Sequence, residues 1–157
     1  MMILRLPAVS FGAVSAIVTS VGLIIGFGAA ELSKPTIISG LLIVGLADNL
    51  TDSLSIHIYQ ESEKLEQRAA FMATLGNFAT RLFISLSFIA FVLAFSMFKA
   101  IAAALTWGIL LLACLTWAVA KSRNASIPME ILKHLSVAAV VIVVSHTTGM
   151  LIHVFAY

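Results

Sequence analysis

Two aspartates lie four residues apart inside one of the most apolar parts of the chain, in the stretch GLADNLTDSLSIHIYQESE (45–63). A carboxylate at the centre of a helix in lipid costs about 2.5–3.5 kcal/mol, so such groups usually face protein or water. In a helix, the i, i+4 spacing of Asp48 and Asp52 places both side chains on one face. The pair therefore indicates a site for a cation or a proton inside a bundle of helices.

A histidine and three glutamates continue this polar stretch. His57 follows the two aspartates, and Glu61, Glu63 and Glu66 alternate with basic residues in a segment without Gly or Pro. Carboxylate and imidazole together suit a divalent first-row metal, whereas carboxylates alone suit magnesium or calcium. The aspartates and the histidine are thus candidate metal ligands. The glutamates are either an acidic patch that collects metal or the ordinary solvated face of a helix.

One arginine is a candidate partner for the aspartates. Arg81 lies about ten residues into the third apolar stretch, roughly 15 Å from its start. If the second and third stretches pack antiparallel, Arg81 reaches the depth of Asp48, and an ion pair lowers the cost of both charges. Asp52 is then left as the freer ligand. In the alternative, Arg81 extends toward the membrane surface, or a shorter third span begins at Leu82. Residues 69–80 then form an interfacial helix, and Asp48 has no partner.

The elements that carry these residues are apolar. Of the 157 residues, 61% are hydrophobic and only 10% are charged, whereas about a quarter are charged in a soluble domain. The composition predicts an all-α, multi-pass integral membrane protein that forms a single transmembrane domain over residues 1–157. A span needs roughly 20 apolar residues. The five expected spans are about 8–30, 36–58, 70–97, 100–120 and 131–156, with a cytosolic helical extension at 59–69.

The basic residues predict the orientation. With the N-terminus in the cytosol, six of them fall on the inner side: Arg5, Lys64, Arg68, Lys121, Arg123 and Lys133. Only Lys34 and Lys99 fall on the outer side. Because cytoplasmic loops carry the excess of Lys and Arg, we expect the N-terminus inside and the C-terminus outside.

Small residues recur in the first span. Gly22 and Gly26 form a small-xxx-small pattern, which lets two helices approach closely. The pattern predicts helix packing, either within the chain or between two copies of it.

Several function classes are excluded by what the sequence lacks. The net charge is only +2, and no basic stripe or RNA-binding motif is present, so we expect no nucleic-acid partner. No nucleophile elbow, phosphate-cradling loop, HExxH motif or haem-attachment motif occurs. We therefore expect neither an enzyme nor a tightly bound cofactor.

Two stretches resemble the vacuolar iron transporter family of divalent metal exporters. SAIVTSVGLIIGFGAA (15–30) is similar to the family's first-span pattern of an acidic residue, then G-L-V-T, then G-L-v-a-G. The stretch 45–63 is similar to its second-span pattern G-L-A-D-x-x-S-M, followed by G-E-Y. The resemblance implies a homodimer whose first two spans line a pathway, with protons exchanged for Fe²⁺ or a similar ion leaving the cytosol. It also implies a cytosolic helical domain that gathers metal through glutamates.

The chain departs from that pattern at most of its ligand positions. Ser15 stands where the family has its first-span acid, and Asp52 stands at the methionine. Ile56 and His57 replace the glutamate and tyrosine of G-E-Y, so Asp48 alone matches a family acid. The insertion after the second span is too short for the three-helix metal-collecting domain. Asp52 and His57 are candidates to replace the lost ligands.

The leading hypothesis is a dimeric, proton-linked transporter with a divalent metal ion, iron or manganese, as its substrate. It lies in a lipid bilayer and pairs with a second copy through its first span. Two other hypotheses stay open. In one, the protein is a non-transporting membrane scaffold or subunit with a structural Asp48–Arg81 pair. In the other, it exports small organic cations, but pockets for these usually have aromatic walls, and the second span offers only Tyr59 at its end.

Overall fold

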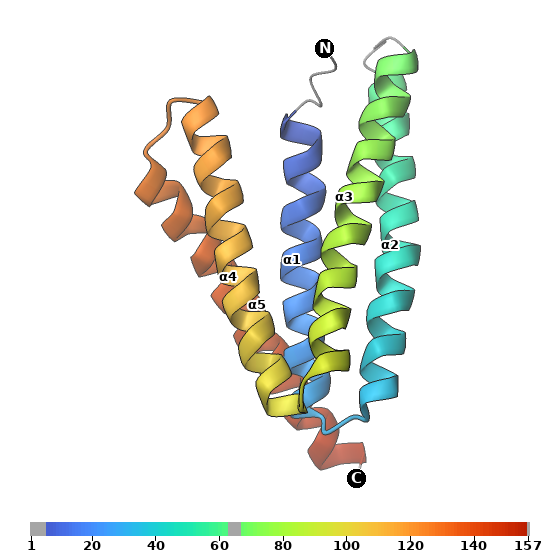
Figure 1. The fold of residues 1–157 in the computed structure, drawn as a ribbon, viewed down its shortest axis with the longest axis vertical. Helices are drawn as coiled ribbons and strands as arrows, with labels where there is room; N and C mark the ends of the chain where they lie inside the picture. The colour runs from blue at the N-terminus through green and yellow to red at the C-terminus, as the bar shows by residue number, and fades with distance from the viewer. Residues whose placement is uncertain (1–5, 63–66, 157) are drawn as a thin grey trace.

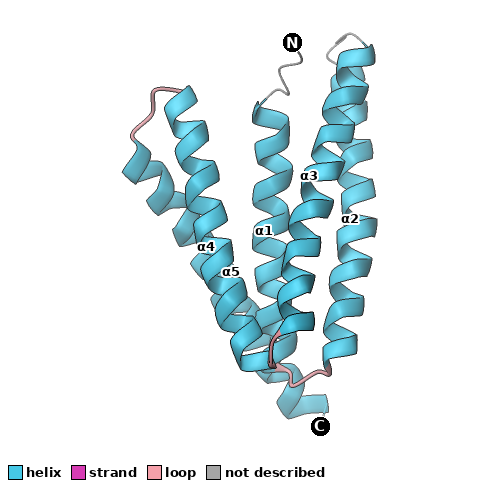
Figure 2. Cartoon of the chain, viewed as in Figure 1, coloured by secondary structure: helices cyan, strands magenta, loops and turns pink. Residues whose placement is uncertain are grey.

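The computed structural model describes residues 6–62 and 67–156, which form a bundle of helices (Figures 1 and 2). In chain order the helices are α1 (Leu6–Ala29), α2 (Lys34–Ser62), α3 (Gln67–Ala94), α4 (Met97–Ser122) and α5 (Ile127–Ala156). Every regular element in the described ranges is a helix, so the expected all-α class is confirmed.

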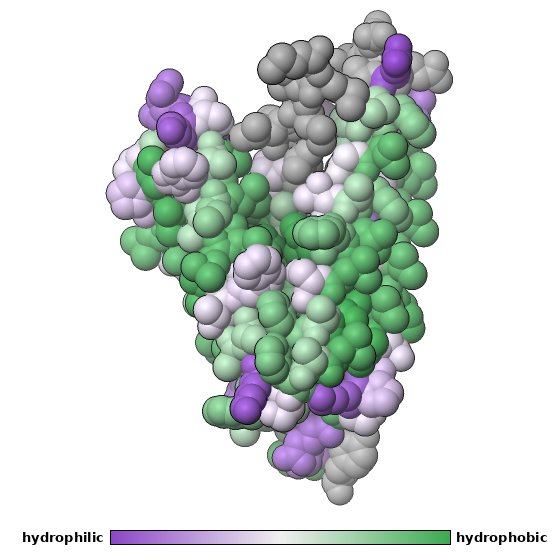
Figure 3. Space-filling view, viewed as in Figure 1, coloured by the Kyte–Doolittle hydropathy of each residue, from purple (hydrophilic) through white to green (hydrophobic). Residues whose placement is uncertain are grey.

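All five helices are long and apolar enough to cross a membrane. They contain 24 to 30 residues, or about 36–45 Å at 1.5 Å per residue, which exceeds the hydrocarbon thickness of a bilayer. Apolar side chains cover the middle of the face drawn in Figure 3, and hydrophilic ones gather toward its two ends. The protein is therefore an integral, multi-pass membrane protein.

The helix bounds differ from the expected spans by up to four residues, and α5 begins at Ile127 rather than near residue 131. α3 ends at Ala94 and α4 begins at Met97, so Lys99 lies in the first turn of α4 rather than in the connection. Ser96 precedes α4 in an extended conformation, with φ −61° and ψ 156°. α2 continues to Ser62, which includes the first part of the expected extension at 59–69.

α1 lies at the centre of the bundle and contacts each of the other four helices. α2 packs chiefly on α3, while α5 packs on α1 and α4, so Figure 1 shows α1 between two pairs of helices. Ile24 of α1, Phe88 of α3 and Leu112 of α4 are fully buried in the shared core. α5 is mostly exposed and presents its apolar side chains outward.

Polar contacts join the helices near one end of the bundle. Lys34 Nζ, at the start of α2, donates to the carbonyl oxygen of Phe95 just after α3, at 2.5 Å. Trp107 Nε1 of α4 donates to Ser87 Oγ of α3 at 3.1 Å. The Lys34–Phe95 contact joins the turns α1–α2 and α3–α4, which Figure 1 shows side by side, and the Trp107–Ser87 contact ties α4 to α3.

Candidate functional site

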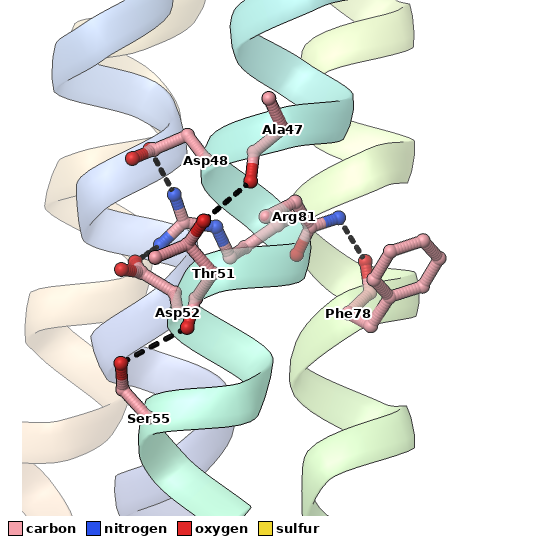
Figure 4. Close-up of polar contacts among 8 residues, drawn as sticks. Ala47, Asp48, Thr51, Asp52, Ser55, Phe78 and Arg81 are labelled. Atoms are coloured by element: carbon pink, nitrogen blue, oxygen red, sulfur yellow. Dashed lines mark hydrogen bonds and ion pairs between the residues drawn. The ribbon is translucent and has the colours of Figure 1, made fainter.

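The site is a bridge of three charged side chains between α2 and α3 (Figure 4). Nη2 of Arg81 lies 2.6 Å from Oδ2 of Asp48. Nη1 of the same guanidinium contacts Oδ2 of Asp52. Because the two aspartates are one helical turn apart on one face of α2, each can meet one of the two terminal nitrogens of the planar guanidinium. We call this group the Asp48–Arg81–Asp52 bridge.

The geometry differs from the expectation for Asp52. The Asp48–Arg81 contact is present as expected, but Asp52 is also engaged by Arg81 and is not the freer carboxylate. The sequence reasoning treated the pair as a single contact at one depth. An arginine side chain has two terminal nitrogens, so it reaches carboxylates a full helical turn apart.

The positively charged side chain of the bridge is more deeply buried than the two negatively charged ones. The Arg81 side chain is 4% exposed, whereas those of Asp48 and Asp52 are 45% and 30% exposed. One guanidinium faces two carboxylates, so the ionised bridge carries a net charge of −1. The surplus negative charge therefore lies on the exposed side of the bridge, where another group can approach it.

A small pocket between α1, α2 and α3 adjoins the bridge. It is lined by Asp48 and Arg81 and by three residues with hydroxyl groups, Thr19, Ser20 and Ser85, together with apolar neighbours. Ser20 and Ser85 are buried. The hydroxyl and carboxylate oxygens that line this pocket give it a polar interior, whereas the lipid around the bundle is apolar.

Two hydroxyl side chains near the aspartates on α2, those of Thr51 and Ser55, form hydrogen bonds with the backbone of their own helix. Thr51 Oγ1 donates to the carbonyl oxygen of Ala47 at 2.9 Å, and Ser55 Oγ donates to that of Thr51 at 3.0 Å (Figure 4). Such bonds to the carbonyl four residues earlier are common for Ser and Thr in membrane helices. The hydroxyl hydrogens of Thr51 and Ser55 are therefore used within α2 itself.

The remaining expected metal ligands are not gathered around the bridge. His57 Nε2 lies 3.4 Å from Glu61 Oε1, one turn further along α2. Glu63 and Glu66 lie outside the described residues. Within residues 6–62 and 67–156, no three His, Cys, Asp or Glu side chains are close enough to hold a metal ion. The described part of one chain therefore offers only partial ligand sets.

The glycine pattern of α1 packs on α5 of the same chain. A Cβ at Gly22 would lie 3.0 Å from Ser145 Oγ, and one at Gly26 would lie 3.1 Å from the carbonyl oxygen of Ser145. Gly149 of α5 approaches the backbone of Gly26 so closely that a Cβ there would overlap its carbonyl oxygen. These glycines permit close contact between helices within the chain. Of the two expected alternatives for Gly22 and Gly26, the structure shows the packing within the chain, against α5.

Sequence reasoning missed three buried polar residues beside the bridge. Asn49, Ser53 and Asn77 are 1%, 6% and 0% exposed. Nδ2 of Asn49 donates to the carbonyl oxygen of Phe78 at 2.8 Å and so ties α2 to α3. The sequence offered one sign of their burial, an asparagine in each of two neighbouring apolar spans. An amide side chain in lipid is expensive, so it usually faces another helix.

No protein-family model matches the chain, and searches of curated proteins and of solved structures found no match.

Proposed function

We propose that the protein transports a divalent metal ion, iron or manganese, out of the cytosol. One observation carries this proposal: two half-exposed carboxylates share one buried guanidinium, which leaves a net negative charge at mid-helix. A fixed surplus charge inside a membrane is expensive. It favours a mobile cation that neutralises it, and the transported ion is such a cation.

The charge balance favours a divalent ion held by two copies of the chain. Each bridge carries −1, so two bridges related by a two-fold axis carry −2 and are neutralised by one M²⁺. Pairing through the face where Asp48 and Asp52 are exposed also removes these carboxylates from lipid. It completes a ligand set of four carboxylates, since each chain supplies two. This homodimer does not involve Gly22 and Gly26, whose side of α1 packs on α5.

Proton exchange follows from the same groups. Without metal, a proton on one aspartate of each copy neutralises the surplus charge. Metal binding then displaces these protons, which couples metal movement in one direction to proton movement in the other. With the N-terminus in the cytosol, His57 and Glu61 lie at the cytosolic mouth of this route and receive the metal first.

The test is metal-driven proton flux in liposomes that contain the purified protein. Asp48→Asn and Asp52→Asn should each reduce Fe²⁺ or Mn²⁺ flux and the accompanying proton flux by at least tenfold. Glu31→Gln, an exposed carboxylate in the α1–α2 turn, is the matched control and should leave both fluxes unchanged. Undiminished flux in both aspartate variants would remove the bridge from the mechanism.

A second candidate function is a non-transporting scaffold. It is favoured by the engagement of both carboxylates by Arg81, because such a bridge fixes α2 against α3 whether or not a metal ion binds. The charge-swapped variant Asp48→Arg with Arg81→Asp separates the two. If the wild-type protein and the swapped variant both fold and neither moves metal, the scaffold is the correct function.

A further inference from the structure

A layer of buried polar side chains lies next to the bridge, between α1, α2 and α3. It consists of Asn49 and Ser53 on α2 and Asn77 on α3, and each is at least nine-tenths buried. Asn49 and Ser53 are one turn apart on the face of α2 that meets α3. Asn77 lies beside Phe78, whose carbonyl oxygen accepts the hydrogen bond of Asn49. Asn49 therefore joins the two helices that carry the bridge.

Most polar atoms of this layer have no protein partner. Among the described residues, no hydrogen bond reaches either amide atom of Asn77, Oδ1 of Asn49 or Oγ of Ser53. The same is true of Nε of Arg81, the one nitrogen of that guanidinium that does not face an aspartate. More than nine in ten buried polar groups in native proteins are hydrogen-bonded. Five unpaired buried atoms on α2 and α3 therefore point to a bound ligand.

Helix α1 brings Asn77 and Arg81 to the same place. A Cβ at Gly12 would overlap Oδ1 of Asn77 and would lie 3.0 Å from Cγ of Arg81. Both side chains, which are one turn apart on α3, thus pack over the bare backbone of Gly12. The amide of Asn77 is therefore adjacent to the buried stem of Arg81.

The chemistry of the unpaired atoms selects the ligand. Asn77 Nδ2 and Arg81 Nε are donors, whereas the Oδ1 atoms of Asn49 and Asn77 are acceptors. A ligand for this set must accept and donate hydrogen bonds at once, and it must be small. A metal cation is disfavoured, because it would meet the positive guanidinium and its N–H groups. Buried water meets all of these conditions, since it typically makes about three hydrogen bonds to otherwise unsatisfied groups.

We propose that the layer of Asn49, Ser53 and Asn77 is a binding site for ordered water that accepts a hydrogen bond from Nε of Arg81. The water fixes the guanidinium on the side away from the aspartates, so that its two terminal nitrogens point at Asp48 and Asp52. Asn77 is then a positioning residue for Arg81. This inference does not rest on the proposed transport function.

The test compares two variants of Asn77 that both fit over Gly12. Asn77→Ser keeps one polar group for the water, and Asn77→Ala keeps none. With ordered water in the layer, the full-length Asn77→Ser protein in detergent should unfold about 2–4 °C above Asn77→Ala, the shift expected for one hydrogen bond in a chain of this size. In a dry layer, a serine bonds only to its own helix and gains nothing over alanine. An alanine variant as stable as the serine variant would overturn the proposal.

Thr116 on α4 provides the matched control. Its hydroxyl is also buried and unpaired, but it is the one such atom on α4 among the described residues. A lone atom cannot supply the two to four partners that a buried water needs. We therefore expect Thr116→Ser and Thr116→Ala to unfold at the same temperature.

An experimental density map of the wild-type protein tests the site without any variant. We expect density for water within hydrogen-bond distance of Nε of Arg81 and the amide of Asn77. A map in which the amides pair directly with each other or with Arg81, with no water between them, would refute the proposal even if the variants fail to fold.

Discussion

Arg81 and Asp48 face each other across the α2–α3 interface, with Nη2 of the arginine 2.6 Å from Oδ2 of the aspartate. The arginine is almost fully buried, while the aspartate is nearly half exposed. This asymmetry makes Arg81 the fixed member of the bridge and the carboxylates its approachable members. It also makes the arginine the residue whose removal has the clearest consequences.

Replacing Arg81 with methionine should destabilise the protein by on the order of 3 kcal/mol, because two carboxylates lose the cation that bridges them within residues 6–62 and 67–156. The free energy of unfolding in mixed micelles measures this effect. Neutralising all three charges with Asp48→Asn, Asp52→Asn and Arg81→Met should recover most of the loss. An Arg81→Met protein as stable as the wild type would show that the bridge does not stabilise the fold.

A methyl group at Gly12 should disturb the bridge from α1. In Gly12→Ala the new Cβ overlaps Oδ1 of Asn77 and contacts the stem of Arg81, so both side chains must move. We expect a loss of about 1–3 kcal/mol, typical of overpacking in a core. Gly28→Ala is the control: its Cβ meets the flexible ends of Ile101, at 2.9 Å, and Met97, at 3.5 Å, and alanine is the better helix former. A Gly12→Ala protein as stable as Gly28→Ala would contradict the packing of Asn77 and Arg81 over Gly12.

Replacing each glycine between α1 and α5 with alanine should destabilise the protein to a degree set by the atoms that the new methyl group meets. Gly149→Ala should destabilise most, because its Cβ overlaps the backbone oxygen of Gly26, which cannot rotate away. Gly26→Ala follows, with a backbone atom at 3.1 Å, and Gly22→Ala comes last, since the side chain of Ser145 can turn. Thermal unfolding of the three variants gives the order.

The same variants test whether this contact lies within one chain. We expect the oligomeric state, measured by native mass spectrometry, to be unchanged in all three. Dissociation of a dimer by Gly22→Ala or Gly26→Ala, without loss of stability in the monomer, would instead place these glycines between two copies.

Orientation can be measured with cysteines introduced in place of two exposed serines. Cys114→Ala removes the single native cysteine, and Ser33→Cys and Ser126→Cys then mark the α1–α2 and α4–α5 connections. With the N-terminus in the cytosol, a membrane-impermeant maleimide should label residue 33 from outside in intact cells and residue 126 only in inside-out vesicles. The reverse pattern would invert the topology, and labelling of both from one side would contradict five spans.

The layout of the helices was largely predictable because it depends on local composition. Stretches of apolar residues long enough to cross a bilayer are visible along the chain, and the five helices fall on the five expected stretches. The boundary near Lys99 was misplaced because a single charge does not end a helix. The chain turns at Phe95 and Ser96 instead, and Lys99 lies inside α4.

The candidate site was predictable only in part. The spacing of Asp48 and Asp52 placed both on one face, and the depth of Arg81 brought it near the first of them. Its contact with Asp52 depends on how far α2 and α3 are offset along each other, which no local pattern specifies. The buried amides of Asn49 and Asn77 were overlooked because a single polar residue in an apolar span carries no periodic signal.

The sequence by itself determined that this chain is a helical, multi-pass membrane protein with charge inside its second and third spans, because hydrophobicity and helical spacing are properties of neighbouring residues. The tertiary structure alone decided which groups meet. It turned both aspartates toward one arginine, placed Gly22 and Gly26 against α5, and buried Asn77 over Gly12. These contacts join residues distant in the chain, and their geometry follows from the rotation and offset of whole helices as they pack.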